Sequence, residues 1–338
     1  MKLSIFFNKH WYSKSLTWFT ILLYPFSIVF LILISIRSII LKYLYSNKRV
    51  VDIPTIVIGN ISVGGVGKTP LVNALAHKLK QAGYKPGIVS RGYGGSNKSF
   101  PLEVKLDNRI DLYGDESYML KELLDCPVVI CPNRSEAVKF LSKKEVDVII
   151  SDDGLQHYKM FRDIEIAVVD GVRKFGNGML LPSGPLREPK GRLKQVDYIV
   201  VNGGDKIYKN DIIMRTMPIA LINMKTGQEY PPDFLINKDI HAIAGIGDPN
   251  KFFKDLLSMN YSITEHPFKD HHTFSNNDFK GLESTIIIMT HKDAIKCQFL
   301  SINNGNCFYM KIGVKISDKF YTSVKSSLNQ LKIELSYT

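Results

Sequence analysis

The order of apolar and polar residues divides the chain into two parts. An almost uncharged apolar run lies near the N-terminus, and beyond residue 52 short apolar runs alternate with amphipathic ones. Unbroken Val and Ile runs predict buried strands, and apolar residues three or four positions apart predict helices. The expected strands are 55–59, 87–90, 127–131, 146–151, 164–170, 196–202, 241–246, 285–290 and 308–312, and the expected helices are 70–82, 116–124, 134–143, 250–259 and 322–331. This alternation predicts an α/β fold with a mostly parallel sheet and helices on both faces.

A weakly patterned stretch at 205–235, which contains Pro231-Pro232, predicts a linker between two α/β units. We therefore expect three parts: a membrane-associated helix at 1–45, a main domain at 46–212, and a smaller α/β domain at 213–338 that closes over a cleft.

The apolar run at residues 18–36 predicts a membrane helix. Its 19 residues carry no charge, which is just long enough to cross a hydrocarbon core. A cleaved signal peptide and a buried core helix are the alternatives. Basic residues precede the run (Lys9, Lys14) and follow it (Lys42, Lys48), so charge does not decide whether the helix crosses the membrane or lies in one leaflet.

Composition limits the classes of partner that the chain can be expected to bind. Of its 338 residues 45% are hydrophobic and 22% charged, which excludes a disordered chain. The 44 Lys and Arg residues exceed the 32 Asp and Glu residues by 12, so anionic partners are favoured. The basic residues are dispersed and no nucleic-acid recognition motif is present, which argues against a nucleic-acid binder. The four cysteines form no C-x-x-C pair and predict reduced, buried thiols.

A glycine-rich turn, SVGGVGKT, lies between the first expected strand and the first expected helix. Glycines let successive backbone N–H groups face one anion, and the helix N-terminus adds partial positive charge. In such a loop Lys68 binds the β- and γ-phosphates and the Thr69 hydroxyl binds Mg²⁺. The strict motif has glycine where this chain has Ser62. The predicted nucleotide-binding residues are Ser62, Val63, Gly64, Gly65, Val66, Gly67, Lys68 and Thr69.

Asp152 and Asp153 follow the buried run at 146–151. The carboxyl end of a parallel strand is where a phosphate-loop fold places the carboxylate that organises Mg²⁺. A pair of aspartates after a strand can also serve as a helix cap. With the glycine-rich turn upstream, we favour the metal-binding interpretation, in a P-loop NTPase-like fold.

With these residues assembled, the chain resembles the tetraacyldisaccharide 4′-kinase family of lipid A biosynthesis. The matching stretches stand in the family's order and cover nearly the whole chain: IGNISVGGVGKTP (58–70), SRGYGG (90–95), GDE (114–116), DDGLQH (152–157), LPSGPLREP (181–189), GIGDPNKF (245–252), FKDHHTF (268–274) and THKDAIK (290–296). His291 in the last stretch departs from the family's pattern, in which we expect an acidic residue.

The resemblance implies transfer of the γ-phosphate of ATP to the 4′-hydroxyl of a tetraacyldisaccharide 1-phosphate, which forms the 4′-phosphorylated lipid A precursor. It implies ATP and Mg²⁺ as cofactors and an acylated lipid substrate. It also implies a place on the inner membrane, with the catalytic body on the cytoplasmic face. No nucleic-acid or protein partner is expected.

The resemblance also assigns roles to single residues. Asp115 matches the base that accepts the hydroxyl proton, although by sequence alone it could simply cap a helix beginning at Glu116. His271 matches the histidine that pairs with this base, which would require closure across the cleft. The metal candidates are Thr69, Asp152, Asp153 and Glu188, and the residues expected to contact substrate or support loops are Arg91, Tyr93, Glu116, Gln156, His157 and Arg187.

Two other functions compete with this hypothesis. A membrane-associated ATPase switch of the partitioning or division-site type also uses GG-x-GKT loops, but such loops usually carry lysine where this chain has Val63. A GTP-dependent metal chaperone would need clustered Cys or His ligands, and the sequence has none at ligand spacing.

Overall fold

The computed structural model describes residues 2–13, 15–45, 49–107, 109–302 and 305–336. Its strands are β1 (Thr55–Gly59), β2 (Pro86–Ser90), β3 (Leu102–Glu103), β4 (Val128–Ile130), β5 (Val148–Asp152), β6 (Ile164–Asp170), β7 (Tyr198–Asn202), β8 (Ile212–Asn223), β9 (Glu229–Tyr230), β10 (Asp239–Ala244), β11 (Ser262–Pro267), β12 (Ile286–Thr290) and β13 (Cys307–Ile316). Its α-helices are α1 (Lys2–Trp11), α2 (Trp18–Tyr45), α3 (Lys68–Gln81), α4 (Ile110–Tyr113), α5 (Asp115–Leu123), α6 (Arg134–Leu141), α7 (Pro249–Ser258), α8 (His291–Cys297) and α9 (Asp318–Ser336), with 3₁₀ turns η1 (Lys190–Gln195) and η2 (Asn276–Phe279).

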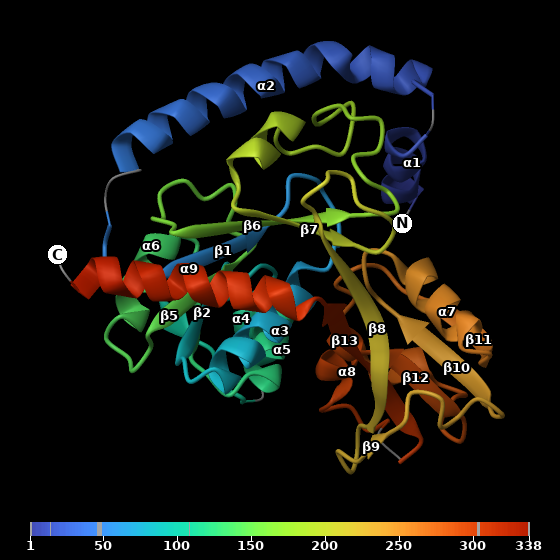
Figure 1. Ribbon diagram of the computed structural model, residues 1–338. Helices are drawn as coiled ribbons and strands as arrows, with labels where there is room; N and C mark the ends of the chain where they lie inside the picture. Colours follow the sequence, from blue (N-terminus) through green and yellow to red (C-terminus); the bar gives the residue numbers. More distant parts are fainter. Residues whose placement is uncertain (1, 14, 46–48, 108, 303–304, 337–338) are drawn as a thin grey trace.

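The thirteen strands of the described residues form one mostly parallel sheet (Figure 1). Its order is β11-β10-β12-β13-β8-β7-β6-β1-β5-β2-β4-β3, and β9 pairs with β8. Strand β1 lies in the middle of the first half, parallel to β5 and β6. Since the carboxyl ends of parallel strands meet at one edge, the loops after β1, β5 and β7 come together there. The expected α/β fold is confirmed.

Alternate residues of the strands supply the two faces of the first half. Ile56 and Ile58 of β1 pack in one core cluster with residues of α3, α5 and α9. Val57 packs in a second cluster with residues of α6 and η1. The period of two in a buried strand therefore gives each face of the sheet its own helical layer.

The second half repeats this layering on a smaller scale. Strands β10, β12 and β13 run parallel to one another, and helix α7 packs on one face through Phe253 and Leu256. Helix α8 covers the other face through Ala294 and Cys297. Strand β11 forms the outer edge of the sheet.

The prediction of a linker at 205–235 was wrong. Residues 212–223 form the long strand β8, which pairs with β7 on one side and β13 on the other. The prediction rested on weak apolar patterning and on Pro231-Pro232, which lies beyond the end of this strand. The strand does contain one proline, Pro218, which cannot donate a hydrogen bond to the ladder. In the structure Pro218 lies opposite Ile312, where the register between β8 and β13 shifts, and such an irregularity tolerates proline.

The proposed division of the chain at residue 212 stays a prediction, and helix α9 adds a detail to it. Phe320, Val324 and Leu328 of α9 pack in the core cluster of the first half, although they belong to the last segment of the chain. The expected boundary at residue 46 falls at 46–48, outside the described residues, as do Lys14 and Lys48.

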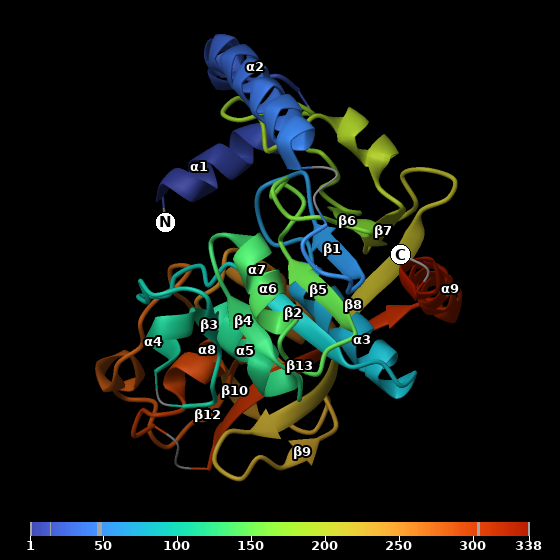
Figure 2. The same ribbon diagram turned by 90° about the vertical axis from the view of Figure 1, so that its left-hand side faces the viewer.

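Helix α2 is longer than the apolar run that predicted it and spans 28 residues. It is long and apolar enough to cross a membrane. In Figures 1 and 2 it lies along the outside of the first half, beside the segment that joins β6 to β7. The hydroxyl of Ser27 donates to Leu180 O and accepts from Ser183 N, so the helix is tied to this segment by hydrogen bonds.

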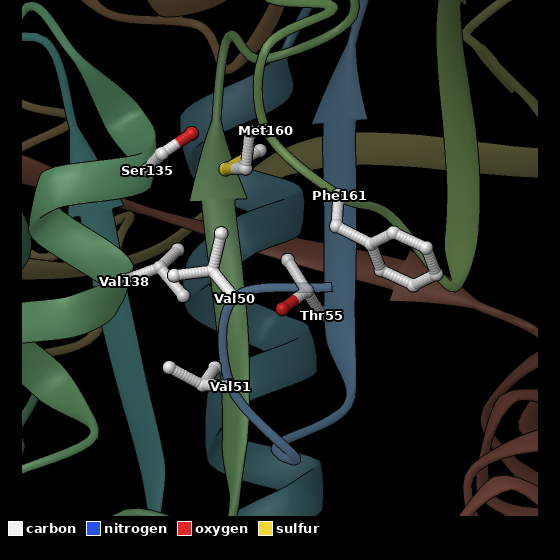
Figure 3. Close-up of a pocket in the computed structure, with 7 residues that line it drawn as sticks. All are labelled: Val50, Val51, Thr55, Ser135, Val138, Met160 and Phe161. Atoms are coloured by element: carbon white, nitrogen blue, oxygen red, sulfur yellow. The ribbon is translucent and has the colours of Figure 1, made fainter. Parts of the chain in front are cut away.

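A small apolar cavity lies under the connection between α2 and β1 (Figure 3). Its lining comes from the start of β1, helix α6 and the loop before β6: Val50, Val51, Thr55, Ser135, Val138, Met160 and Phe161. Its volume of about 10 Å³ holds one water molecule at most. It is a packing defect and lies apart from the residues discussed below.

Candidate active site

The glycine-rich loop (residues 60–67) joins β1 to α3 at the carboxyl edge of the sheet. Gly67 immediately precedes the helix with φ of 94°, in the left-handed region that favours glycine. A Cβ atom at this position would lie 2.4 Å from Nδ2 of Asn202. Both the turn and the neighbouring strand β7 therefore require glycine here.

Side chains from other segments hold the peptide groups of this loop. Nδ2 of Asn202 donates to Val66 O at 3.0 Å. The guanidinium of Arg173 donates to Gly65 O at 2.8 Å, and it also pairs with Asp170 at 2.7 Å. Ser62 forms an isolated antiparallel bridge with Leu186. These contacts fix the loop before any ligand arrives, which is what a preorganised anion site requires.

Lys68 lies in the first turn of α3 and points to two polar partners. Its Nζ is 3.2 Å from Oδ1 of Asn60 and 3.4 Å from Oδ1 of Asp153. Arg187 lies 3.3 Å from the other oxygen of Asp153. Burial raises the pKa of Asp153, but the charges of Lys68 and Arg187 outweigh burial and hold that pKa below its usual value. The structure thus brings together Lys68, Asp153 and Arg187, three residues for which the sequence predicted separate roles.

Asp152 is the last residue of β5 and is buried. None of the residues that the structure describes forms a hydrogen bond with its Oδ1 atom. Burial, followed by the charge of nearby Glu116, raises the pKa of Asp152 to about 7. A buried carboxylate oxygen without a partner is unfavourable in the protein alone, and a bound cation would satisfy it.

Glu188 lies close by but is engaged by other protein groups. Its Oε1 accepts from the hydroxyl of Tyr158, and its Oε2 is 3.3 Å from Nε2 of Gln156. Gln156 also donates to Asn60 O at 2.8 Å, which ties its loop to the glycine-rich loop. Within the described ranges, no group of three or more His, Cys, Asp or Glu side chains is arranged to hold a metal ion.

His157 is a structural group in this arrangement. Its Nε2 accepts from the backbone N–H of Arg134 at 3.2 Å, at the first residue of α6. Burial, followed by the charges of Arg134 and Arg162, lowers the pKa of His157 to about 4. The imidazole is therefore neutral near pH 7 and able to accept this bond.

Asp115 and His271 meet although 156 positions separate them in the chain. Asp115 opens helix α5, whose cap position is Gly114, so Asp115 is not the cap that was its alternative role. Nδ1 of His271 lies 3.1 Å from Oδ2 of Asp115. The N-terminus of a helix favours a negative carboxylate. The expected contact between the two halves is present in the structure.

The loop after β2 lies against this pair. Tyr93 is exposed, and the centre of its ring is 5.4 Å from that of His271. Gly114 has φ of 79°, and a Cβ atom there would lie 2.2 Å from Tyr93 O. Close backbone packing at Gly114 therefore sets the distance between this loop and Asp115. Arg91, at the start of the loop, is exposed.

Two further contacts join α5 to α8. Nζ of Lys292 lies 3.5 Å from Oε1 of Glu116 and 3.6 Å from Oδ1 of Asp270. Nε2 of His291 lies 2.8 Å from Oε2 of Glu122, and its ring stacks on Tyr309 at 4.4 Å. The family's acidic residue at position 291 would face Glu122, whereas the histidine of this chain pairs with Glu122.

Sequence reasoning missed several polar residues of the site. Asn60 and Asn202 lie at the carboxyl ends of β1 and β7, as Asp152 does at the end of β5. A search for polar residues at the ends of buried strands would have found both. Arg173 and Lys292 carry no comparable signal, because the site groups that they contact, Gly65 O for Arg173 and the carboxylates of Glu116 and Asp270 for Lys292, come from distant segments.

Comparison with known proteins agrees with this geometry. The sequence profile of the "Tetraacyldisaccharide-1-P 4'-kinase" family, LpxK, matches residues 19–329. The chain belongs to this family. Proteins named tetraacyldisaccharide 4′-kinase from Legionella pneumophila strain Corby and Francisella novicida are 44% and 43% identical to it. These matches cover 94% and 92% of the chain, and 96% and 99% of the relatives.

A solved structure of the family is similar as well. A crystal structure of LpxK from Aquifex aeolicus, described as an apo form in complex with ATP, superposes with a TM-score of 0.78 at 29% identity. The match covers 92% of this chain and 99% of the other. The family and the fold expected from the sequence are confirmed, and the chain is a kinase of this family.

Proposed function

We propose that the protein transfers the γ-phosphate of ATP to the 4′-hydroxyl of a tetraacyldisaccharide 1-phosphate. The observation that carries the proposal is the 3.1 Å contact between Asp115 and His271, with the Lys68 and Asp153 pair held beside the glycine-rich loop. A phosphate-binding loop alone also serves hydrolysis and switching. A carboxylate held by a histidine supports transfer to an alcohol, which must lose its proton.

In the proposed step the 4′-oxygen attacks the γ-phosphorus, and the bond from that phosphorus to the β–γ bridging oxygen breaks. The hydroxyl proton passes to a carboxylate oxygen of Asp115, and ADP leaves. His271 holds the Asp115 carboxylate in place through their contact. Lys68 and the backbone N–H groups of the glycine-rich loop balance the charge of the phosphates.

The residues at the carboxyl edge fit a bound Mg²⁺ ion. The Oδ1 atom of Asp152, which has no hydrogen-bond partner among the described residues, is the observation that supports this fit, and Thr69 supplies a further oxygen of the kind that Mg²⁺ prefers. Asp153, whose two oxygens face Lys68 and Arg187, would contact the ion through water. We propose that Glu188 contacts the ion only through water, because both of its oxygens already accept hydrogen bonds. The ion would neutralise charge on the transferred phosphate.

We propose that the acylated substrate approaches from the side of α2. A cavity of about 250 Å³ lies between α2 and the loop after β5, and Arg37 and Lys159 are among its lining residues. These two cations suit an anionic head group. Arg91 and Tyr93 lie on the loop beside Asp115 and would contact the sugar, and Arg187 would contact phosphate. Residues 213–338 would close over residues 46–212 through the contact at His271.

A lipid-kinase assay tests the proposal. Purified protein in detergent is given ATP, Mg²⁺ and the tetraacyldisaccharide 1-phosphate, and the lipid is examined for a second phosphate. The expected result is one phosphate added per ADP formed. ADP release without a phosphorylated lipid would contradict the proposal and favour an ATPase switch, which the family membership does not support.

We propose that α2 lies in the plane of the cytoplasmic face of the inner membrane. Four residues of α2 form hydrogen bonds with the rest of the protein: Thr20, Ser27, Arg37 and Lys42. These residues span roughly 33 Å of helix. A helix crossing the membrane would have to break most of these contacts. Large apolar side chains stay exposed along its length: Leu22, Phe26, Leu33, Ile36 and Ile40.

Labelling at the two ends of α2 tests this orientation. Trp18→Cys and Tyr43→Cys place single thiols at exposed positions near the two ends, and the native cysteines are buried. In sealed vesicles with the protein bound outside, an impermeant thiol reagent should label both variants alike. Labelling of only one end would show that the helix crosses the bilayer.

A further inference from the structure

Lys292 lies at the centre of an ion-pair bridge beside the Asp115–His271 contact. Its Nζ atom is 3.5 Å from a carboxylate oxygen of Glu116 and 3.6 Å from one of Asp270. Glu116 follows Asp115 in the chain, and Asp270 precedes His271. The bridge therefore joins the two residues that are next to the contact partners, one from each half of the molecule.

The backbone that carries Lys292 is firmly held. The next residue, Asp293, is fully buried and accepts from Thr290 Oγ1 at 2.6 Å and from Gly245 N at 2.8 Å. It also pairs with Lys296 at 2.7 Å. The first turn of α8 is thus fixed to the ends of β12 and β10. The Lys292 side chain is only 15% exposed, so solvent screens its charge less than that of a surface lysine.

The loop that carries His271 depends on Asp270. His271 has φ of 58°, a left-handed conformation that costs a residue other than glycine on the order of 1 kcal/mol. Its backbone N–H donates to Oδ1 of Asp270 at 3.1 Å. The same oxygen is the one that Lys292 approaches. One carboxylate thus links the conformation of His271 to the charge of Lys292.

We propose that Lys292 is a positioning residue for the phosphoryl transfer, which holds Glu116 and Asp270 together and so keeps the Asp115 carboxylate against His271. This inference rests on the proposed function. An ammonium group suits this place because it is a compact charge that attracts carboxylates from different directions. Without it, Glu116 and Asp270 would face each other as like charges from the two halves of the chain.

The contact between His291 and Glu122 provides a matched control. It joins the same two helices, but Glu122 lies seven residues beyond Asp115 in the chain, about 10 Å along α5. Loss of this contact weakens the interface between α5 and α8 without touching the neighbours of Asp115 and His271. This control separates the effect of weakening the interface between α5 and α8 from the effect of losing the Lys292 bridge.

The test compares Lys292→Met, Lys292→Arg and Glu122→Gln in the lipid-kinase assay. Misplaced catalytic groups lower turnover, so kcat of Lys292→Met should fall roughly 10- to 100-fold. Its KM for ATP should stay within about twofold, because the glycine-rich loop is held by other residues. Lys292→Arg keeps the charge and should retain at least about a third of the wild-type kcat. Glu122→Gln should keep kcat within about twofold.

A second readout needs no lipid. Hydrogen exchange of the backbone at 268–274 should be faster in Lys292→Met than in the wild type and unchanged in Lys292→Arg. If the wild type phosphorylates no lipid, the proposed function fails, and this readout still tests the bridge. Unchanged exchange in Lys292→Met would overturn the bridge itself.

Other results overturn the inference without affecting the proposed function. They are a normal kcat in Lys292→Met, a Lys292→Arg variant as slow as Lys292→Met, or an equal loss in Glu122→Gln. If Lys292→Met does not fold, Glu116→Gln removes one side of the bridge and should lower kcat severalfold, again without a change in the KM for ATP. A normal kcat in that variant would then refute the role of the bridge.

Discussion

The two parts of the candidate active site are built in different ways. The glycine-rich loop and Lys68 come from one continuous stretch between β1 and α3. The Asp115–His271 contact joins residues from opposite halves of the chain and depends on α5, α8 and the loop after β11. The loop is encoded within one segment, and Asn202 and Arg173 from elsewhere only brace it, whereas the contact between Asp115 and His271 exists only when the two halves of the chain meet. We therefore expect the first part to govern nucleotide binding and the second to govern the rate of transfer.

Lys68→Ala should have the largest effect. It removes the cation that faces Asp153 and the phosphates, and the loss of such preorganised charge should lower kcat by roughly a thousandfold, or about 4 kcal/mol. The measurement is steady-state phosphorylation of the lipid. Lys78→Ala, which removes an exposed lysine from the same helix, should leave the rate unchanged. A Lys68→Ala enzyme with near-normal turnover would contradict the role of the loop.

Asp115→Asn should separate the two parts of the site. Without a proton acceptor, kcat should fall about a hundredfold or more while ATP affinity stays nearly intact. Turnover and the dissociation constant of ATP are measured side by side. Asp125→Asn, just beyond the other end of α5 and fully exposed, is the control. If ATP affinity fell together with kcat, the two parts of the site would not be independent.

Asp152→Asn should stabilise the metal-free protein. The folded-state pKa of about 7 is above the unfolded value, so the folded protein binds the extra proton and loses stability as pH rises from about 4 through 7. At pH 8 the wild type must bury an ionised carboxylate, and the variant should be more stable by about 4 kcal/mol. Urea unfolding in a metal chelator at pH 5 and pH 8 measures this. Parallel pH dependence of the two proteins would refute the assignment.

Mg²⁺ should act in the opposite sense. Added Mg²⁺ should raise the melting temperature of the wild type above pH 7, where the Asp152 carboxylate is ionised, and it should have less effect on Asp152→Asn. Equal stabilisation of both proteins would place the ion elsewhere.

Asn202→Ala should have the smallest effect. It removes the hydrogen bond to Val66 O and leaves the lysine in place. One such bond is worth about 1 kcal/mol, so the KM for ATP should rise about fivefold with little change in kcat. A loss in kcat alone would show that β7 acts on the transfer step.

The contrast between the loop of one segment and the contact between the two halves also explains what the sequence could predict. The turn at Lys68 and the helix after it are encoded within one short segment, so glycine spacing and apolar periodicity were sufficient. The pairing of Asp115 with His271 came only from the family resemblance, because nothing in either segment names its partner. Lys292 escaped notice for the same reason, since its bridge requires residues 116, 270 and 292 to converge.

The error at 205–235 has a different cause. The linker prediction rested on weak apolar patterning and on Pro231-Pro232, whereas strand β8 lies before that pair and contains one proline, Pro218. A proline is compatible with a strand where the ladder is irregular, and the irregularity depends on Ile312, which lies 94 positions farther along the chain (312 − 218). Local propensity cannot report on such a distant partner.

Strands β8 and β13 run through both halves of the one sheet. Within the described part of the chain the two halves are joined through this ladder, so any motion that separated His271 from Asp115 would bend hydrogen-bonded backbone. The ladder is interrupted between Lys311 and Ile312, and flexure would concentrate at that interruption. Strain in the two bent strands, rather than free diffusion of a domain on a flexible linker, would then return His271 to Asp115 after each turnover.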